Sequence, residues 1–363
     1  MSNVEKLGNP YQSKYKKGEM IYARNIWDMQ LFQNRIYLGA GNSSNRGPAQ
    51  NAGRVPLYYL DIPSNKFVKE YKVAEEQIDL FKIYDKALYI PGHDATQKWT
   101  YGNIYKKNSG KWKKYRTLPK ALHVYDLVIY KDKIFTAIGL KGKAAVFVSD
   151  DNAKTWKEYF LGKGRVYSFF QIGNTLFATK TFNKKQDNKK SVFQWVEGKG
   201  FIEGADLSLK KIFPDTKLKK CSIKLIKSLS VENIVYYLGS YKHNDHQSKP
   251  FGVYQASIEN RKFTAKKIIL PVNFLPRDII QYKNKVYILA NKLYKDWYTI
   301  KVFSVEKTLP LEVLSYHYPT LARSFEKYNN CFYFGMGSDL TSLKNWKQKE
   351  LKKETGDIIK YCY

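Results

Sequence analysis

Residues 123–160 read HVYDLVIYKDKIFTAIGLKGKAAVFVSDDNAKTWKEYF, and this stretch decides the fold. It contains four runs rich in β-branched and aromatic residues, at 123–130, 133–138, 144–149 and 155–160. Short segments rich in Gly, Asp and Lys separate the runs and have the composition of turns. We therefore predict an antiparallel sheet of four strands, which we call strands A to D in chain order.

The step Asp132-Lys133-Ile134-Phe135 within this stretch recurs along the whole chain. Seven segments place an aromatic residue after a polar turn and an apolar step, at Tyr37, Tyr89, Phe135, Phe177, Tyr236, Tyr287 and Tyr333. These positions are on average about 49 residues apart, a spacing typical of β-propeller blades. The sequence predicts an all-β fold, a seven-bladed β-propeller of four-stranded antiparallel blades. Because the interval before Tyr236 is the longest, six blades plus an insertion is the alternative.

No low-complexity linker interrupts the 363 residues, so we expect a single propeller domain, 1–363, with 1–19 as an N-terminal extension. Either the tail Asp357–Tyr363 closes the ring by pairing with blade 1, or the N-terminal segment closes it. The three cysteines, Cys221, Cys331 and Cys362, show no CxxC spacing. That pattern indicates neither a zinc site nor a disulfide framework.

The turn between strands C and D of the quoted stretch reads Ser149-Asp150-Asp151-Asn152-Ala153-Lys154-Thr155-Trp156. It resembles the Asp-box, S-x-D-x-G-x-T-W, of the Asp-box (BNR, sialidase-like) β-propeller superfamily, with Ala153 at the usual Gly position. The resemblance implies a propeller fold, and it implies little about activity because the motif is a folding device. Weaker echoes occur at 108–112 and 342–346. The Phe/Tyr-Arg-Ile-Pro motif of sialidases does not occur.

The chain is strongly basic, with 63 Lys and Arg against 32 Asp and Glu and a net charge of +31. Such an excess favours anionic partners: an anionic saccharide, another polyanion or nucleic acid, although no nucleic-acid motif is present. No apolar run reaches the roughly 18 residues of a membrane span. The first 20 residues lack the apolar core of a signal peptide, so the sequence does not identify the cellular compartment. If the N-terminus has been processed, we expect a secreted or periplasmic protein. We expect a monomer.

The B–C loops and the D–A connections of a propeller open on one face, around the central channel. There the sequence places amides, hydroxyls, carboxylates, aromatic rings and most of its nine arginines. Arginine suits bidentate binding of oxyanions, so this face predicts a polar, arginine-bearing pocket for an anionic saccharide. The candidate ligand-binding residues are Arg24, Asp28, Asn42, Ser44, Asn45, Asn51, Arg54, Asp94, Trp99, Arg165, Tyr167, Arg277, Asp278 and Arg323.

Catalysis is left open by the sequence, and the candidate catalytic residues are His93, His123, Tyr125 and Asp126. Glycoside hydrolysis would need a pair of carboxylates. Lyase chemistry on a uronic acid would need charge neutralisation and a proton shuttle. We expect no metal and no cofactor, since no third ligand follows His93-Asp94 at a useful spacing.

Two structural or non-catalytic alternatives remain. Aspartates at the start of strand A often join adjacent blades by accepting backbone hydrogen bonds. Separately, the alternative function is a non-catalytic scaffold that binds polyanions or a protein partner through its Lys-rich surface.

Overall fold

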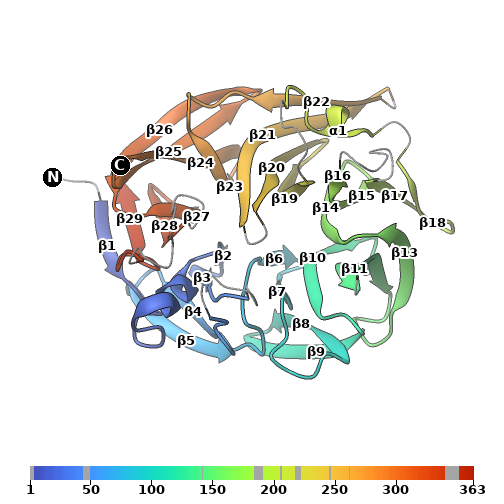
Figure 1. The fold of residues 1–363 in the computed structure, drawn as a ribbon, viewed down its shortest axis with the longest axis horizontal. Coiled ribbons are helices and arrows are strands. Elements are labelled where there is room, and N and C mark those ends of the chain that lie inside the picture. Colours follow the sequence, from blue (N-terminus) through green and yellow to red (C-terminus); the bar gives the residue numbers. More distant parts are fainter. Residues whose placement is uncertain are drawn as a thin grey trace.

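Seven antiparallel sheets form a closed ring in the computed structural model, so the predicted all-β, seven-bladed propeller is confirmed (Figure 1). The six-bladed alternative is wrong. The structure describes residues 4–43, 50–140, 142–183, 191–204, 207–216, 222–244, 247–260, 262–339 and 351–363. Among these, the only helical segments are a 3-10 helix, η1 (Gly18–Arg24), and the single turn α1 (Leu209–Ile212).

Blades 1 to 3 each run from an inner strand A to an outer strand D. Blade 1 contains β2 (Asp28–Phe32), β3 (Arg35–Gly39), β4 (Pro56–Asp61) and β5 (Lys66–Lys72). Blade 2 contains β6 (Lys82–Tyr84), β7 (Ala87–Pro91), β8 (Tyr101–Asn108) and β9 (Lys111–Pro119). Blade 3 contains β10 (His123–Tyr130), β11 (Lys133–Leu140), β12 (Lys143–Ser149) and β13 (Lys157–Lys163). The strands of blade 3 lie within a few residues of the ranges predicted from the sequence.

Blades 4 to 6 continue the ring and become longer. Blade 4 contains β14 (Val166–Ile172), β15 (Thr175–Lys180), β17 (Val192–Val196) and β18 (Gly200–Glu203). Blade 5 contains β19 (Ser222–Val231), β20 (Ile234–Asn244), β21 (Gln247–Glu259) and β22 (Lys262–Ile268), with β16 (Phe182–Asn183) added at its inner edge. Blade 6 contains β23 (Leu275–Tyr282), β24 (Lys285–Tyr294), β25 (Trp297–Glu306) and β26 (Leu309–Tyr318).

Both ends of the chain close the ring in blade 7, which contains β27 (Leu321–Tyr328), β28 (Cys331–Gly337), β29 (Ile358–Cys362) and β1 (Val4–Gly8). The tail is strand C of its own blade and does not pair with blade 1. The N-terminal strand β1, from the expected extension, pairs with β29 as strand D. A disulfide joins Cys331 to Cys362, which are direct cross-strand partners, so the expectation of no disulfide was wrong. The spacing rule failed because the two cysteines meet only through the fold.

The aromatic anchors of the repeat lie on strand B of each blade and form the packing between blades. All seven are at most 7% exposed. In blade 3, for example, the Phe135 ring lies 4.9 Å from the Trp195 ring of blade 4 in an edge-to-face arrangement. Such pairs add to the free energy gained from burying the rings. The repeat was therefore visible in the sequence because one large ring is needed at each junction between blades.

The turn that resembles an Asp-box is held by its own side chains. Asp151 accepts hydrogen bonds from the backbone N of Thr155 (2.9 Å) and from its hydroxyl (2.7 Å). The Ser149 hydroxyl accepts a bond from the backbone N of Ala153, whose φ is 65°. Ala153 thus adopts the left-handed conformation for which glycine is usual at this position. The weaker echo at 342–346 lies outside the described residues.

Candidate functional site

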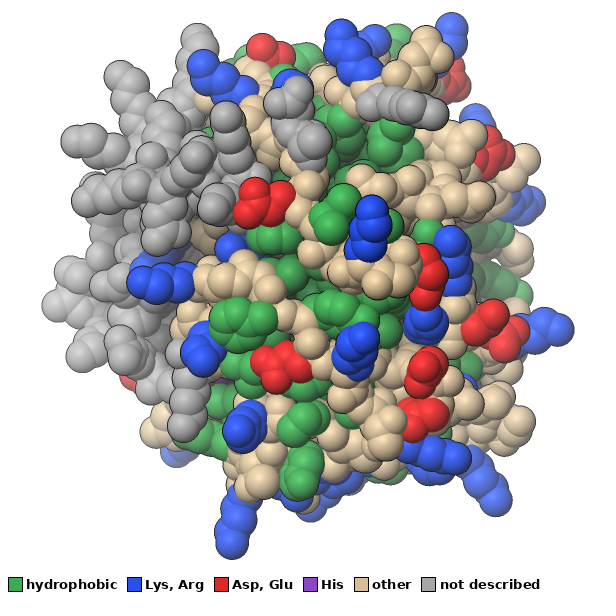
Figure 2. Space-filling model, turned by 90° about the vertical axis from the view of Figure 1, so that its right-hand side faces the viewer, with side chains coloured by type: hydrophobic (Ala, Val, Ile, Leu, Met, Phe, Trp, Pro, Cys, Tyr) green, Lys and Arg blue, Asp and Glu red, His purple; other side chains and the backbone are tan. Residues whose placement is uncertain are grey.

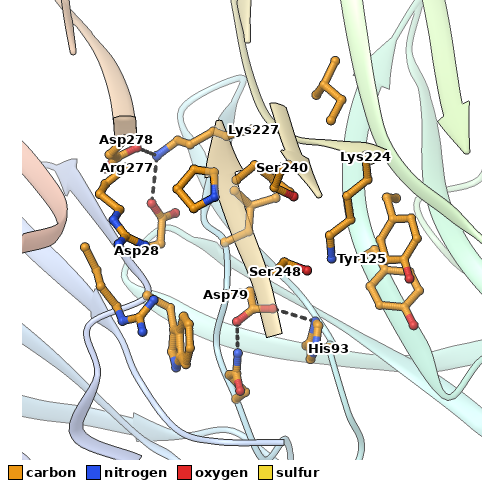
Figure 3. A pocket seen from close by; sticks show the side chains of 18 of the residues that line it. Asp28, Asp79, His93, Tyr125, Lys224, Lys227, Ser240, Ser248, Arg277 and Asp278 are labelled. Carbon is orange, nitrogen blue, oxygen red and sulfur yellow. Dashed lines mark hydrogen bonds and ion pairs between the residues drawn. The ribbon is translucent and has the colours of Figure 1, made fainter. Parts of the chain in front are cut away.

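A cavity of about 540 Å³ opens at the mouth of the central channel, on the face that carries the B–C loops (Figure 3). Ten of the residues selected from the sequence line it: Asp28, His93, Asp94, His123, Tyr125, Arg165, Tyr167, Arg277, Asp278 and Arg323. They come from blades 1, 2, 3, 4, 6 and 7, so the ring brings together segments that are distant in the chain. The volume is in the range of about 300–1,000 Å³ that is typical of small-molecule sites.

A backbone irregularity explains why strand A presents these side chains to the cavity. The pairing of strands A and B shifts by one residue at Tyr125, Tyr167, Ile226, Arg277 and Arg323, in blades 3 to 7 respectively. Such a β-bulge re-aims a side chain, and all five of these residues line the cavity. Trp27 and Asp79 hold the corresponding places just before β2 and β6. The mouth is thus a ring of seven positions, one from each blade.

The remaining sequence candidates lie away from this cavity. Arg24 is buried and donates hydrogen bonds to the carbonyl oxygens of Tyr15 (2.6 Å) and Lys16 (2.5 Å). It therefore pins the N-terminal segment and does not reach a ligand. Trp99 is 65% exposed on the B–C loop of blade 2, outside the cavity.

The long loop of blade 1 contributes less than the sequence indicated. Asn42 is buried and donates to the carbonyl oxygen of Gln50 (2.8 Å), and Asn51 is half-buried in the same loop. Arg54 is exposed, and its carbonyl oxygen accepts a bond from Lys14. Ser44 and Asn45 lie outside the described residues. Among the described residues of this loop, Ser43 is the one that lines the cavity.

The aspartates at the start of strand A have a structural role, as the alternative predicted. Asp28 accepts a hydrogen bond from the backbone N of Phe81 in blade 2, at 2.8 Å. Asp126 accepts one from Phe169 in blade 4 at 2.8 Å, and Asp278 one from Phe325 in blade 7 at 3.1 Å. Asp126 also pairs with Lys82 at 3.2 Å and is not part of the cavity lining. These carboxylates join neighbouring blades.

Two histidines form the centre of one wall of the cavity. His93 Nδ1 lies 2.9 Å from Oδ2 of Asp79, and Gln77 donates a hydrogen bond to the other Asp79 oxygen (Figure 3). Burial of the His93 ring opposes protonation, but the Asp79 carboxylate outweighs it and raises the pKa of His93 above its usual value. His93 is therefore held towards its imidazolium form.

His123 has the opposite electrostatic setting. Its Nδ1 lies 3.0 Å from the carbonyl oxygen of His93. Burial, followed by repulsion from His93, lowers the pKa of His123 to about 4. The neutral ring donates from Nδ1 to that carbonyl, which leaves Nε2 as an acceptor. Two neighbouring imidazoles whose pKa values are driven apart have the character of an acid–base pair.

Aromatic and basic side chains continue the wall beyond the histidines. The rings of His123 and Tyr125 stack at 5.6 Å, and those of Tyr125 and Tyr167 lie 4.7 Å apart. Arg165 donates a 2.6 Å hydrogen bond to the Tyr125 hydroxyl. Lys224 was not selected from the sequence, and its ammonium lies 4.6 Å above the Tyr167 ring. Among the described residues, no carboxylate lies within 4.0 Å of Arg165 or Lys224.

The arginines on the opposite wall are already engaged by the protein. Arg277 pairs with Asp339 at 2.5 Å. Arg323 donates from Nε to Asn25 at 2.6 Å and stacks 4.2 Å from the Trp27 ring. The two walls therefore differ. Arg165 and Lys224 on the histidine wall form no ion pair with a described carboxylate, whereas Arg277 is paired with Asp339 and Arg323 is held by Asn25 and Trp27.

Lys227 forms the floor of the cavity and was also missed by the sequence analysis. It pairs with Asp28 at 3.0 Å and with Asp278 (Figure 3). Burial raises the pKa of Asp278 to about 6, although the Lys227 charge opposes this rise. Below it, Glu326 is 6% exposed, and burial raises its pKa to about 8. Lys227 takes the position that Asp or Ser holds in blades 1, 3, 4, 6 and 7, so only alignment of the blades would have revealed it.

The described residues contain no cluster of three or more His, Cys, Asp or Glu side chains with the arrangement of a metal site. Within the same residues, no helix has the length and apolar character that crossing a bilayer requires.

Comparison with known proteins shows the fold and no closer kinship. No family model and no curated protein sequence matches the chain. A structure of a polysaccharide lyase, an ulvan lyase of family PL25 bound to a saccharide, aligns over 91% of this chain and 90% of its own, with 8% identity and a TM-score of 0.52.

Two further structures have the same architecture. The periplasmic gluconolactonase of Pseudomonas aeruginosa covers 80% of this chain and 85% of its own, with 12% identity and a TM-score of 0.51. The protein U3-55K covers 99% and 98%, with 8% identity and a TM-score of 0.56. The neighbours thus include carbohydrate-active propellers, while membership of the Asp-box superfamily remains a resemblance.

Proposed function

We propose that this protein binds an acidic saccharide in the cavity and cleaves it beside a uronate residue by β-elimination. The observation that carries the proposal is the neutral His123 imidazole next to two cations, Arg165 and Lys224, neither of which forms an ion pair with a described carboxylate. A base and a site for the substrate carboxylate are what this reaction needs. The carbohydrate-active neighbours are consistent with a saccharide ligand.

Arg165 and Lys224 would receive the uronate carboxylate. Both line the cavity on the side of His123, and Arg165 is already oriented by its bond to the Tyr125 hydroxyl. Neutralising the carboxylate makes the proton on the adjacent carbon, C5, more acidic. As C5 loses this proton, negative charge spreads onto the carboxylate, and Arg165 and Lys224 would stabilise that charge in the transition state.

The histidines would divide the proton transfers between them. Nε2 of His123 takes the C5 proton, the C4–O bond to the neighbouring sugar breaks, and a C4=C5 double bond forms. The departing oxygen takes a proton from the His93 imidazolium and becomes the free hydroxyl of the second product. Asp79 keeps His93 protonated for this role.

Hydrolysis by paired carboxylates is less well supported by the geometry. Asp28 and Asp278 are occupied by Lys227 and by backbone amides of adjacent blades. Asp79 is paired with His93. A carboxylate that is held in this way is a poor nucleophile or general acid for a sugar.

The test is incubation with alginate, pectate, hyaluronan, chondroitin sulfate and ulvan, followed by detection of unsaturated uronate ends from their ultraviolet absorbance. We expect one class of polymer to yield such ends. His123→Gln should abolish the product without lowering the melting temperature. A protein that binds none of these polymers, or a His123→Gln variant with full activity, would refute the proposal.

The alternative, a scaffold that binds polyanions, rests on the basic surface. On the face shown in Figure 2, Lys and Arg side chains alternate with Asp and Glu and do not form a continuous basic field. Binding through scattered lysines would fall steeply with salt and would not distinguish heparin or DNA from uronate polymers. Saccharide-specific binding that persists at high salt would exclude this alternative.

A further inference from the structure

The hairpin of β24 and β25 extends beyond the inner strand β23 of blade 6, while the outer strand β26 pairs with it as far as Tyr298↔Tyr318. Strand β23 stops pairing with β24 at Leu275↔Asn291, whereas β24 and β25 remain paired up to Tyr294↔Trp297. Three more residues of β24 therefore rise past the start of the inner strand. At about 3.4 Å per residue, the tip stands about 10 Å above that level. In blade 1, by contrast, β3 and β4 share only four residue pairs.

The tip of this hairpin carries two large aromatic side chains in solvent. Tyr294 is 64% exposed and Trp297 is 53% exposed. They are direct partners across the hairpin, so their side chains project from the same face of it. Single exposed apolar residues are ordinary, but these two rings lie side by side and together present a contiguous apolar surface to solvent.

The hairpin rises from the rim of the cavity. Strand β23 of the same blade supplies Pro276, Arg277 and Asp278 to the cavity lining. Tyr298, next to Trp297, lies near enough to Arg323 for their charges to interact. On the other side of the ring, the B–C segment of blade 2 exposes Trp99 (65%) and Tyr101 (41%), as the positions of β8 and β24 in Figure 1 indicate. Exposed rings therefore stand on opposite sides of the mouth.

We propose that Tyr294 and Trp297 form an outer subsite that stacks against a sugar ring of a long acidic polysaccharide whose uronate residue occupies the cavity. The inference rests on the proposed function and narrows it, because the substrate would be a polymer and not a monosaccharide or a lactone. Rigid aromatic rings offer large contact area at little cost in side-chain entropy. Lys295 follows Tyr294 directly and Lys292 lies two residues before it, and the Lys295 ammonium lies 5.6 Å from the Tyr294 ring. These charges complement an acidic chain.

The test is affinity electrophoresis, which measures how far the protein is retarded in gels that contain alginate, pectate, hyaluronan, chondroitin sulfate or ulvan. The variants are Tyr294→Ala/Trp297→Ala, Arg165→Gln/Lys224→Gln as the cavity variant, and Phe160→Ala as a matched control. Phe160 is an exposed ring (51%) on the outer strand of blade 3. Binding of the trisaccharide from each polymer is measured by calorimetry, and melting temperatures confirm folding.

We expect the hairpin variant to bind the retarding polymer about tenfold more weakly, as the loss of two stacking contacts implies. Its trisaccharide affinity should equal that of the wild type, and Phe160→Ala should change neither. In the wild type, polymer binding should shift the tryptophan fluorescence, and Trp297→Phe should reduce that shift, leaving the part that comes from Trp27 in the cavity.

Equal retardation of the hairpin variant and the wild type would overturn the outer subsite. If the cavity variant alone then lost trisaccharide binding, the proposed function would stand without it. A wild type that no polymer retards would overturn both proposals.

Discussion

The ammonium of Lys227 lies 3.0 Å from a carboxylate oxygen of Asp28, although the two residues are 199 positions apart in the chain. The same ammonium pairs with Asp278. Blade 5 is thus joined across the central channel to blade 1 and to its neighbour, blade 6. This bridge fixes the floor beneath the candidate site.

Replacing Lys227 by Met should destabilise the protein markedly. The change leaves the carboxylates of Asp28 and Asp278 without their shared cation in a buried setting, which costs about 3 kcal/mol. Urea unfolding would measure the loss. Lys224→Met, three residues away on the same strand, is the matched control and should weaken saccharide binding with little change in stability. Equal stabilities for the two variants would show that the bridge contributes nothing.

The two histidines predict a bell-shaped dependence of kcat/KM on pH. Catalysis needs His123 neutral, so activity should rise as the pH increases through about 4, its lowered pKa. It needs His93 protonated, so activity should fall above the raised pKa of His93, which exceeds the ordinary 6.5. Asp79→Asn removes the charge that raises this pKa and should move the alkaline limb to lower pH. An unchanged alkaline limb in that variant would assign the limb to another group.

Glu75 should limit stability at neutral and alkaline pH. It is fully buried, and burial raises its pKa to about 7 from an ordinary 4.5. The folded state holds the proton more tightly than the unfolded state, so stability is lost as the pH rises from 4.5 through 7. Glu75→Gln keeps the acceptor for Asn103 (2.5 Å) and Tyr105 (2.9 Å) and removes the charge.

We expect Glu75→Gln to raise the free energy of unfolding by about 1–3 kcal/mol at pH 8 and to leave it nearly unchanged at pH 4. Denaturant unfolding at both pH values is the measurement. A stability difference that does not vary with pH would mean that Glu75 does not titrate in this range.

The disulfide should stabilise the closure of the ring. Cys331 and Cys362 are separated by 31 residues and join strands B and C of the blade that holds both chain ends. Removing a bond that closes a loop of this size costs about 2–4 kcal/mol. The melting temperature should fall on reduction, and a Cys331→Ser/Cys362→Ser variant should match the reduced protein and ignore the reductant. A wild-type melting temperature that reductant leaves unchanged would contradict this role.

The fold could be predicted because each junction between blades requires one buried ring, and those rings recur in the sequence from Tyr37 to Tyr333. The histidine wall was also predictable, because His93, His123 and Tyr125 come from two successive blades and from segments that open on the same face. Their polar neighbours at predicted strand starts indicated the face on which they lie.

Other features depend on contacts that spacing does not encode. Lys224 and Lys227 are two of many lysines, and only the bulge in β19 brings the second to the position held by Asp or Ser in five of the other blades. Arg24 and Arg54 were selected for their charge, but backbone geometry turned one inward to carbonyl groups and the other to solvent. Cys331 and Cys362 become partners only when the tail forms a strand of its own blade.

A crystal structure of the His123→Gln variant with a bound uronate oligosaccharide tests the central claim most directly. The account predicts a uronate residue in the cavity, with its carboxylate in hydrogen-bond reach of Arg165 and Lys224 and its C5 facing residue 123. A saccharide seated elsewhere on the ring, or one in the cavity with its carboxylate turned to the Arg277 wall, would contradict it.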